Sequence, residues 1–189
     1  SLEHVILELI DPTQGLRAKF YVLLFLSLFK PSNLAHRQAE TVLQAEHLLV
    51  FIGTCNAAPS IRLREAAAAA LAALVPIECL SKSVETRVRE LTAQRLPRSA
   101  NYTHGLWLQV LMLVRSTRLY ADTEAHAVHG IVLPLLHDLR VYSLMDPQSR
   151  KVALDIVYEF ETRLCLEPSS GDCVDALVTD LVHQAQTTC

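Results

Sequence analysis

The 189-residue chain has few of the residues and motifs on which catalysis and cofactor binding usually depend. It contains only 5 glycines, and none of them belongs to a P-loop, a G-x-G-x-x-G turn or a G-x-S-x-G elbow. The 5 cysteines lie far apart and form no C-x-x-C pair, which indicates reduced thiols in a cytosolic or nuclear protein rather than a disulfide framework or a zinc site. Of these two locations we expect the cytoplasm. We therefore expect no catalytic residue, no metal and no cofactor.

Long apolar runs and aromatic residues are also scarce. The run from Phe20 to Leu26 is much shorter than the roughly 20 residues that cross a bilayer, and the later run around Trp107 is interrupted by Gln109. No basic segment precedes an apolar stretch near Ser1, so the pattern predicts neither a signal peptide nor membrane insertion. With 51% hydrophobic but only 6% aromatic residues, the composition favours leucine- and alanine-rich helices that pack on one another.

Charge is distributed unevenly, although the net value of −3 is small. Residues 1–119 hold 13 Lys and Arg against 9 Asp and Glu, whereas residues 120–189 hold 4 against 11. The first part is therefore basic and the second acidic, which is typical of a surface that faces a polyanion or an acidic partner on one side only. The same segregation also arises by chance on a large surface.

Helical periodicity fills almost every segment between the turn residues, and no alternating strand pattern is present. Prolines, glycines and Asp-Pro steps separate the segments. The predicted helices are 2–9, 16–29, 36–55, 60–75, 83–95, 101–118, 122–140, 147–164 and 171–186. Such regular helices joined by short loops predict an all-α fold, an α-solenoid of stacked antiparallel helix pairs of the HEAT or armadillo kind, with a compact helical bundle as the alternative. We expect residues 1–189 to form one stretch of this solenoid, excised from a longer chain.

The segment from Pro59 to Pro76 is the best local sign of a repeat helix. With Ser60 as the cap, leucine and alanine form one apolar stripe, and the alanines permit close contact between helices. Arg64 flanks this stripe and Glu65 points away from it. The pattern resembles the second helix of a HEAT or armadillo repeat.

A second segment, from Asn101 to Arg115, is a strongly apolar helix that opens with polar residues and a glycine. We expect Asn101 to cap this helix and His104 to bond a backbone carbonyl of a neighbouring loop. Gly105 costs about 1 kcal/mol relative to alanine inside a helix, so a neighbouring backbone is expected to pack against it. The spacing i+3 and i+4 places His104, Gly105 and Leu108 on the Asn101 side of the helix.

The best candidates for binding a polyanion lie between Lys82 and Arg98. Arg87 and Arg89 are spaced to pair with Glu90 and Glu85 on their own helix, which is the ordinary solvated arrangement. Arg95 and Arg98 have no such acidic neighbours, and an arginine fork suits phosphate oxygens. We list as candidate RNA or partner contacts Arg87, Arg89, Arg95 and Arg98.

Two other constellations are weaker. His126, His129 and His137 follow one another on a predicted helix, but the helix is otherwise an ordinary apolar one, so metal binding is not favoured. Cys55 and His47 are eight residues apart with nothing to orient them as a nucleophile and base. Core packing explains both better than an enzyme does.

Three segments in order resemble one protein family. They are LRAKFYVLLFLSLFKPS from Leu16, IRLREAAAAALAALVP from Ile61 with Arg64 and Glu65, and NYTHGLWLQVLMLV from Asn101. Their order and spacing are similar to those of the thyroid-adenoma-associated (THADA) family of large α-solenoid proteins, over residues 1–118. The most specific positions are Asn101, His104, Gly105 and Gln109.

The resemblance implies a non-catalytic scaffold that helps a separate tRNA methyltransferase subunit to 2′-O-methylate the anticodon loop, and it allows direct contact with tRNA. It implies no methyl-donor site in this chain. The rival hypothesis is a protein-interaction solenoid, an adaptor or regulator without RNA contact. A continuous basic groove through the four candidate arginines favours the first hypothesis, and dispersed charges favour the second.

Overall fold

The computed structural model describes residues 6, 8–11, 13–28, 45–93, 99–117, 122–137 and 145–164. Within these residues every regular element is helical and no strand occurs. The helices with defined bounds are α2 (Leu16–Ser27), α4 (Ala45–Cys55), α5 (Ile61–Leu74), the 3-10 turn η1 (Ile77–Cys79), α6 (Leu80–Thr92), α7 (Ala100–Ser116), α8 (Asp122–His137) and α10 (Pro147–Leu164). The predicted all-α class is confirmed.

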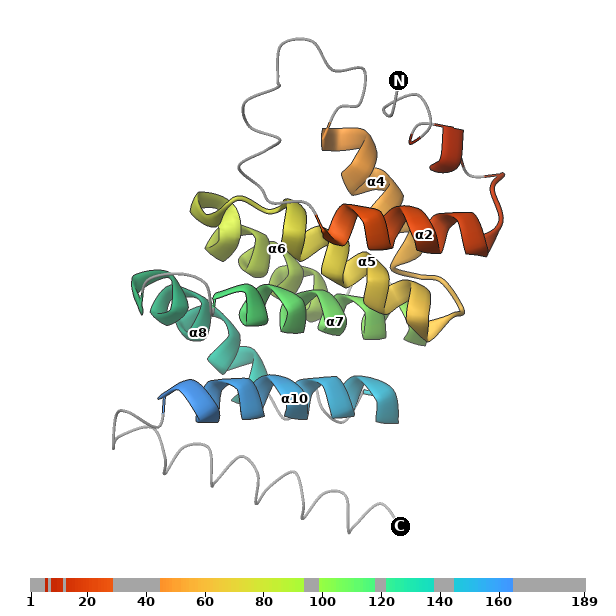
Figure 1. Cartoon of the computed structure of the whole chain (residues 1–189). Helices are drawn as coiled ribbons and strands as arrows, with labels where there is room; N and C mark the ends of the chain where they lie inside the picture. Colours follow the sequence, from red (N-terminus) through yellow and green to blue (C-terminus); the bar gives the residue numbers. More distant parts are fainter. Residues whose placement is uncertain are drawn as a thin grey trace.

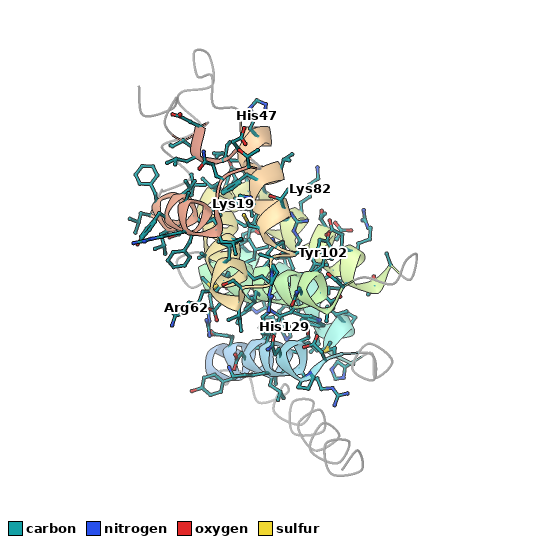
Figure 2. The ribbon with its side chains drawn as sticks, turned by 90° about the vertical axis from the view of Figure 1, so that its right-hand side faces the viewer. Lys19, His47, Arg62, Lys82, Tyr102 and His129 are labelled. Atoms are coloured by element: carbon teal, nitrogen blue, oxygen red, sulfur yellow. The ribbon has the colours of Figure 1, made fainter. Side chains whose placement is uncertain are left out.

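The helices form two layers. In the first layer α2 packs on α5, α5 on α7, and α7 on α10, so that these four helices follow one another from top to bottom of Figure 1. In the second layer α6 packs on α8, and α4 and α6 also contact the first layer through α5 and α7. Figure 2 shows the layers edge-on, with Arg62 of α5 and Lys82 of α6 on opposite sides. This order of stacked pairs is an α-solenoid.

First-layer helices begin at Leu16, Ile61, Ala100 and Pro147. These starts are about 40 to 50 residues apart, which is the interval typical of HEAT and armadillo repeats and longer than the 34 residues of a TPR unit. Each of the three intervals contains one first-layer helix followed by one second-layer helix, α4, α6 or α8. The chain thus advances by one helix pair per interval.

Small residues allow α5 to sit between two neighbours. Ala66, Ala67, Ala68 and Ala70 are all buried, so α2 and α7 approach the α5 backbone from both sides. Alanine has the highest helix propensity and no rotamer entropy to lose, so this close packing has little local cost. Leu63 and Leu71 complete the buried surface of the helix. The predicted alanine stripe is therefore a helix-packing surface.

Helix α7 lies at the centre of the described structure. It contacts α5, α6 and α10, and its residues are buried without a break from His104 to Leu111. Trp107 is completely inaccessible. A helix that is apolar almost all round is expected to be enclosed on every side. Two polar residues of this helix, His104 and Gln109, are consequently placed inside the core.

Helix α2 is apolar on two opposite faces. Val22, Leu23 and Leu26 are buried against the rest of the core. The opposite face exposes Tyr21, Leu24, Phe25 and Leu28, which follow the i, i+3, i+4, i+7 spacing of one helical stripe. The guanidinium of Arg17 lies over the ring of Tyr21, 5.9 Å from its centroid, at one end of this stripe.

Apart from the start of the predicted helix 36–55, the predicted bounds of α2, α4, α5, α6, α7, α8 and α10 agree with the structure to within three residues. Both bounds of α6 are shifted by three residues, since it spans Leu80–Thr92 rather than 83–95, because η1 leads directly into it after Pro76. The predicted helix 171–186 and the first part of the predicted helix 36–55 lie outside the described residues. Among the helices described, no single one is both long and apolar enough to cross a membrane.

Candidate functional site

A buried guanidinium group lies where several helices meet. It belongs to Arg64, near the start of α5, and the residue is only 2% exposed. Burial of an arginine is costly unless its donors are satisfied, because the guanidinium remains charged under all ordinary conditions. The surroundings of Arg64 therefore show what this part of the fold is built to hold.

Arg64 donates to a ring of neutral acceptors. Nε donates to Nδ1 of His104 at 3.1 Å, and Nη2 donates to Oε1 of Gln148 at 3.3 Å. Nη1 donates to Oδ1 of Asn101 at 3.0 Å and to the backbone carbonyls of Ala58 at 2.6 Å and Pro59 at 3.0 Å. We call the side chains of Arg64, Asn101, His104 and Gln148 the Arg64 cluster.

The Arg64 cluster joins parts of the chain that are far apart in sequence. The acceptors come from α7, from α10 and from the loop between α4 and α5, and Gln148 is 84 positions from Arg64. One side chain thus connects three successive first-layer helices. Since each hydrogen bond to a charged donor contributes about 1.5 to 3 kcal/mol, the cluster is a major determinant of how these helices are spaced.

The acid with the largest electrostatic effect on Arg64 is Asp146, which precedes α10. Its Oδ1 accepts from the backbone amides of Gln148 and Ser149, and its Oδ2 accepts from the Ser149 hydroxyl at 2.6 Å. Asp146 is therefore the N-cap of α10, with Pro147 at the first helical position. Burial opposes its ionisation, but the bonds from Ser149 and Gln148 outweigh burial and hold the pKa of Asp146 below its usual value.

Electrostatics inside the cluster follow from burial. Desolvation lowers the pKa of Arg64, and the charges of Asp146 and Glu65 oppose this shift. Desolvation, followed by the charge of Arg64, lowers the pKa of His104, and Asp146 again opposes the shift. His104 is consequently neutral near pH 7, with a lone pair on Nδ1 to accept from Arg64 and its ring proton on Nε2.

Gly105 provides the close approach that its position in the helix predicts. A Cβ atom added there would lie 2.7 Å from Cγ of Asn56 and even closer to the carbonyl oxygen and Oδ1 of the same residue. The Asn56 side chain also donates from Nδ2 to the carbonyl of Tyr102 at 3.4 Å. The Cα hydrogen of Gly105 that takes the place of Cβ thus points at two oxygens of Asn56 and can form weak Cα–H···O contacts with them. Such a contact gives Oδ1 of Asn56 a partner, since it accepts no conventional hydrogen bond in the described residues.

Two details of the expected motif are wrong. Helix α7 begins at Ala100 and its N-cap is Ser99, whose hydroxyl accepts from the amide of Tyr102 at 3.2 Å, so Asn101 does not cap the helix. Asn101 instead accepts from Arg64. His104 likewise accepts from Arg64, and it is Arg64 rather than His104 that bonds the loop carbonyls.

Arg64 is the central residue that the sequence pattern undervalued. Alanine follows Arg64 at i+3 and i+4, so this face of α5 is small enough for other helices to pack closely on it. Because α2 and α7 both pack on α5, the Arg64 side chain has no route to solvent. That combination is the signal that could have predicted its burial. Glu65, the next residue, is exposed as expected. Gln109 is buried at 2% exposure, and its Oε1 has no hydrogen-bond partner in the described structure.

The candidate arginines on α6 are paired with acids of their own helix. Arg87 contacts Glu90 at 2.9 Å and Arg89 contacts Glu85 at 2.8 Å. Oε2 of Glu90 also accepts from the Tyr102 hydroxyl of α7 at 3.2 Å. Arg87 therefore helps to fix α6 against α7. Arg95 and Arg98 lie outside the described residues, so their proposed role stays a prediction.

Neither of the weaker constellations forms a reactive site in the described residues. His129 packs edge-on against Phe160, with ring centroids 4.9 Å apart, whereas His126 and His137 are exposed, and no group of three metal ligands occurs in this part of the chain. Cys55 is buried and His47 is exposed. Burial raises the pKa of the Cys55 thiol, which makes it less nucleophilic.

The fold and the Arg64 cluster define a protein of stacked helical repeats whose polar motif residues hold helices together. Comparison with protein families agrees with this class. The model of the C-terminal TPR repeats of Trm732 matches residues 1–113, and the chain belongs to this family. No match was found among the curated proteins or among the solved structures.

The family match supports the coarse part of the resemblance. It confirms a helical-repeat family, while membership of the THADA family in particular is not what the match shows. Its description names TPR repeats, whereas the sequence pattern predicts repeats of the HEAT or armadillo kind. Both are stacked pairs of antiparallel helices, so the solenoid class holds under either description.

Proposed function

We propose that the chain is a non-catalytic scaffold segment that partners a tRNA 2′-O-ribose methyltransferase acting on the anticodon loop, as the THADA resemblance implies. The observation that carries this proposal is the match of residues 1–113 to the C-terminal repeats of Trm732. We infer a cytoplasmic complex from the unpaired thiols of Cys55 and Cys79. A solenoid suits this role because it presents an extended, rigid surface to partners.

The described residues favour protein contact over RNA contact as the main role. The polar residues most specific to the resemblance include His104, which is buried, and half-buried Asn101, and the side chains of both accept hydrogen bonds from Arg64. On α6 the cations Arg87 and Arg89 are paired with acids. Paired charges neutralise one another at the distances that matter for phosphate binding, so this helix offers no continuous basic groove.

The test is reconstitution of the full chain with the methyltransferase subunit. We expect the two proteins to co-elute, and we expect addition of the chain to raise 2′-O-methylation of the tRNA anticodon loop, measured by mass spectrometry of digested tRNA. A chain that neither binds the enzyme nor changes the methylation would refute the proposal. Arg64→Leu, which disrupts the buried cluster, serves as the folding-defective control.

Direct tRNA contact is tested separately with the double variant Arg95→Gln and Arg98→Gln. Each phosphate contact that is lost should flatten the dependence of affinity on salt by about one unit of logarithmic slope. Lys151→Gln is the matched control, because Lys151 is an exposed cation on α10 that pairs with Asp155. Equal affinities and slopes for the double variant and wild type, across a salt series with the assembled complex, would leave the protein-contact role alone.

A further inference from the structure

We propose that His104 is a proton-sensitive latch that holds α5, α7 and α10 together while its imidazole is neutral and loosens their junction when it is protonated. The proposal is carried by the hydrogen bond from Nε of Arg64 to Nδ1 of His104 and by the position of this pair. Both residues are only 2% exposed, so the pair is not an exposed contact that water can replace. The proposal does not depend on any role of the chain in tRNA modification.

The chemistry of the two side chains gives the latch its direction. A guanidinium group has donors only, so Nδ1 must present a lone pair to Arg64. Protonation of the imidazole places a hydrogen on Nδ1, which removes the acceptor and sets two cations against each other at a separation of 3.1 Å. The Nε donor of Arg64 then has no partner in a place where water does not reach, and a buried donor without a partner is destabilising.

Other charged groups around the pair do not reverse this direction. Asp146, at the entry to α10, attracts a positive imidazole, but its two oxygens already accept from Ser149 and Gln148. The loop between α4 and α5 contributes neutral carbonyls, and Glu65 of α5, which is exposed, acts on the charge of Arg64. On α6, Glu90 is engaged by Arg87 and by the Tyr102 hydroxyl.

The balance of these effects fixes the range in which the latch responds. Burial and the charge of Arg64 lower the pKa of His104 below the free value of 6.5, and Asp146 only partly opposes them. The folded chain therefore holds fewer protons at this site than the unfolded chain does. The stabilisation is complete above pH 6.5 and is lost as the pH falls through the lower pKa of the folded state.

The first experiment compares the pH dependence of unfolding for the full chain and for His104→Asn. The amide oxygen of asparagine lies near the place of Nδ1, so it can accept from Arg64, and it does not titrate in this range. Between about pH 7 and about pH 5, the unfolding constant of wild type should rise more steeply than that of His104→Asn, by up to about tenfold per pH unit. His47→Asn is the matched control and should keep the wild-type slope, because His47 is exposed.

The second experiment uses the wild-type chain alone and does not depend on the variant folding. Hydrogen exchange, corrected for the intrinsic pH dependence of amide exchange, is followed at about pH 7 and about pH 5. Faster exchange at the lower pH should be concentrated in the first turns of α5, α7 and α10. The proposal is overturned if His104→Asn keeps the wild-type pH slope, or if exchange at this junction is no faster at the lower pH.

Discussion

The replacement of Gly105 by alanine separates two opposite effects on the same helix. Alanine improves the propensity of a helix interior by about 1 kcal/mol relative to glycine. At Gly105 the new methyl group would instead meet Asn56, with Cγ at 2.7 Å and the carbonyl oxygen and Oδ1 closer still. Real Cβ atoms essentially never lie under 3.0 Å from such atoms, so something must move.

The atoms that must move belong to the corner between α4 and α5, which several hydrogen bonds hold in place. The amide of Asn56 donates to the carbonyl of Ile52 at the end of α4. Two residues further on, the carbonyl of Ala58 accepts from Arg64. Because the corner shifts only if such bonds lengthen, we expect the overpacking cost to reach about 3 kcal/mol, the upper part of the usual range. After subtraction of the helix-propensity gain, Gly105→Ala should destabilise the chain by about 2 kcal/mol.

The assay is thermal or urea unfolding of the full chain, with two internal controls. Gly53 in α4 and Gly130 in α8 are exposed helical glycines with nothing within 4 Å of an added Cβ. Their alanine variants should be neutral or more stable by up to about 1 kcal/mol. Gly105→Ala should lower the melting temperature by roughly 4 to 8 °C for a chain of this size.

A rescue variant tests the cause. Asn56→Ala removes Cγ and Oδ1 but leaves the backbone oxygen, so it should relieve only part of the loss when combined with Gly105→Ala. If Gly105→Ala is as stable as Gly130→Ala, the close approach of the backbones is not what requires glycine at this position. Full recovery in the double variant would assign the conflict to the Asn56 side chain alone.

Three further predictions concern the bonds between helices. Arg64→Lys should cost about 3 kcal/mol in unfolding experiments, because lysine keeps the charge but cannot reach His104, the loop carbonyls and Gln148 together as the guanidinium does. The control Arg62→Lys, at an exposed position of the same helix, should change stability by less than about 0.5 kcal/mol. Asp146→Ala should cost about 1 kcal/mol at neutral pH through loss of the α10 cap. Because the pKa of Asp146 is lowered in the folded state, a pH series should show that this difference from wild type disappears as the pH falls below 3.8. Glu90→Gln should destabilise the chain by about 1 kcal/mol, because Glu90 joins Arg87 to Tyr102. Glu85→Gln affects an exposed pair and should change the free energy of unfolding by less than about 0.5 kcal/mol, so equal effects of the two variants in parallel melts would contradict this assignment.

The local elements were largely predictable because their causes are local. Alanine and leucine periodicity, bounded by Pro59 and Pro76, is enough to predict α5, and the apolar pattern after Asn101 is enough to predict α7. The start of α6 was misplaced because the 3-10 turn at Ile77 continues into the helix without a clear stop signal. Pairing of Arg87 with Glu90 also followed from helical spacing alone.

The candidate site was predictable in its members but not in its connections. Asn101, His104 and Gly105 were singled out because polar residues and a glycine are unexpected at the start of an apolar helix. The sequence spacing could not show that Arg64, 37 positions before Asn101, would be their common partner. For the same reason the cap was assigned to Asn101 instead of Ser99: a polar side chain near a helix start can serve either as a cap or as an acceptor for a distant residue.

By itself, the sequence determined that this protein is built of helices and where most of them lie, because helix propensity and hydrophobic periodicity act over a few residues. The glycine inside a helix predicted a close approach at Gly105, but the contact with Asn56 that requires it is tertiary. Only the tertiary structure decided that the charge of Arg64 lies inside the stack. The reason is physical: a guanidinium group can be buried only where enough acceptors converge, and here they come from a loop, from α7 and from α10. That convergence depends on how the helix pairs stack, and no segment of the chain contains it alone.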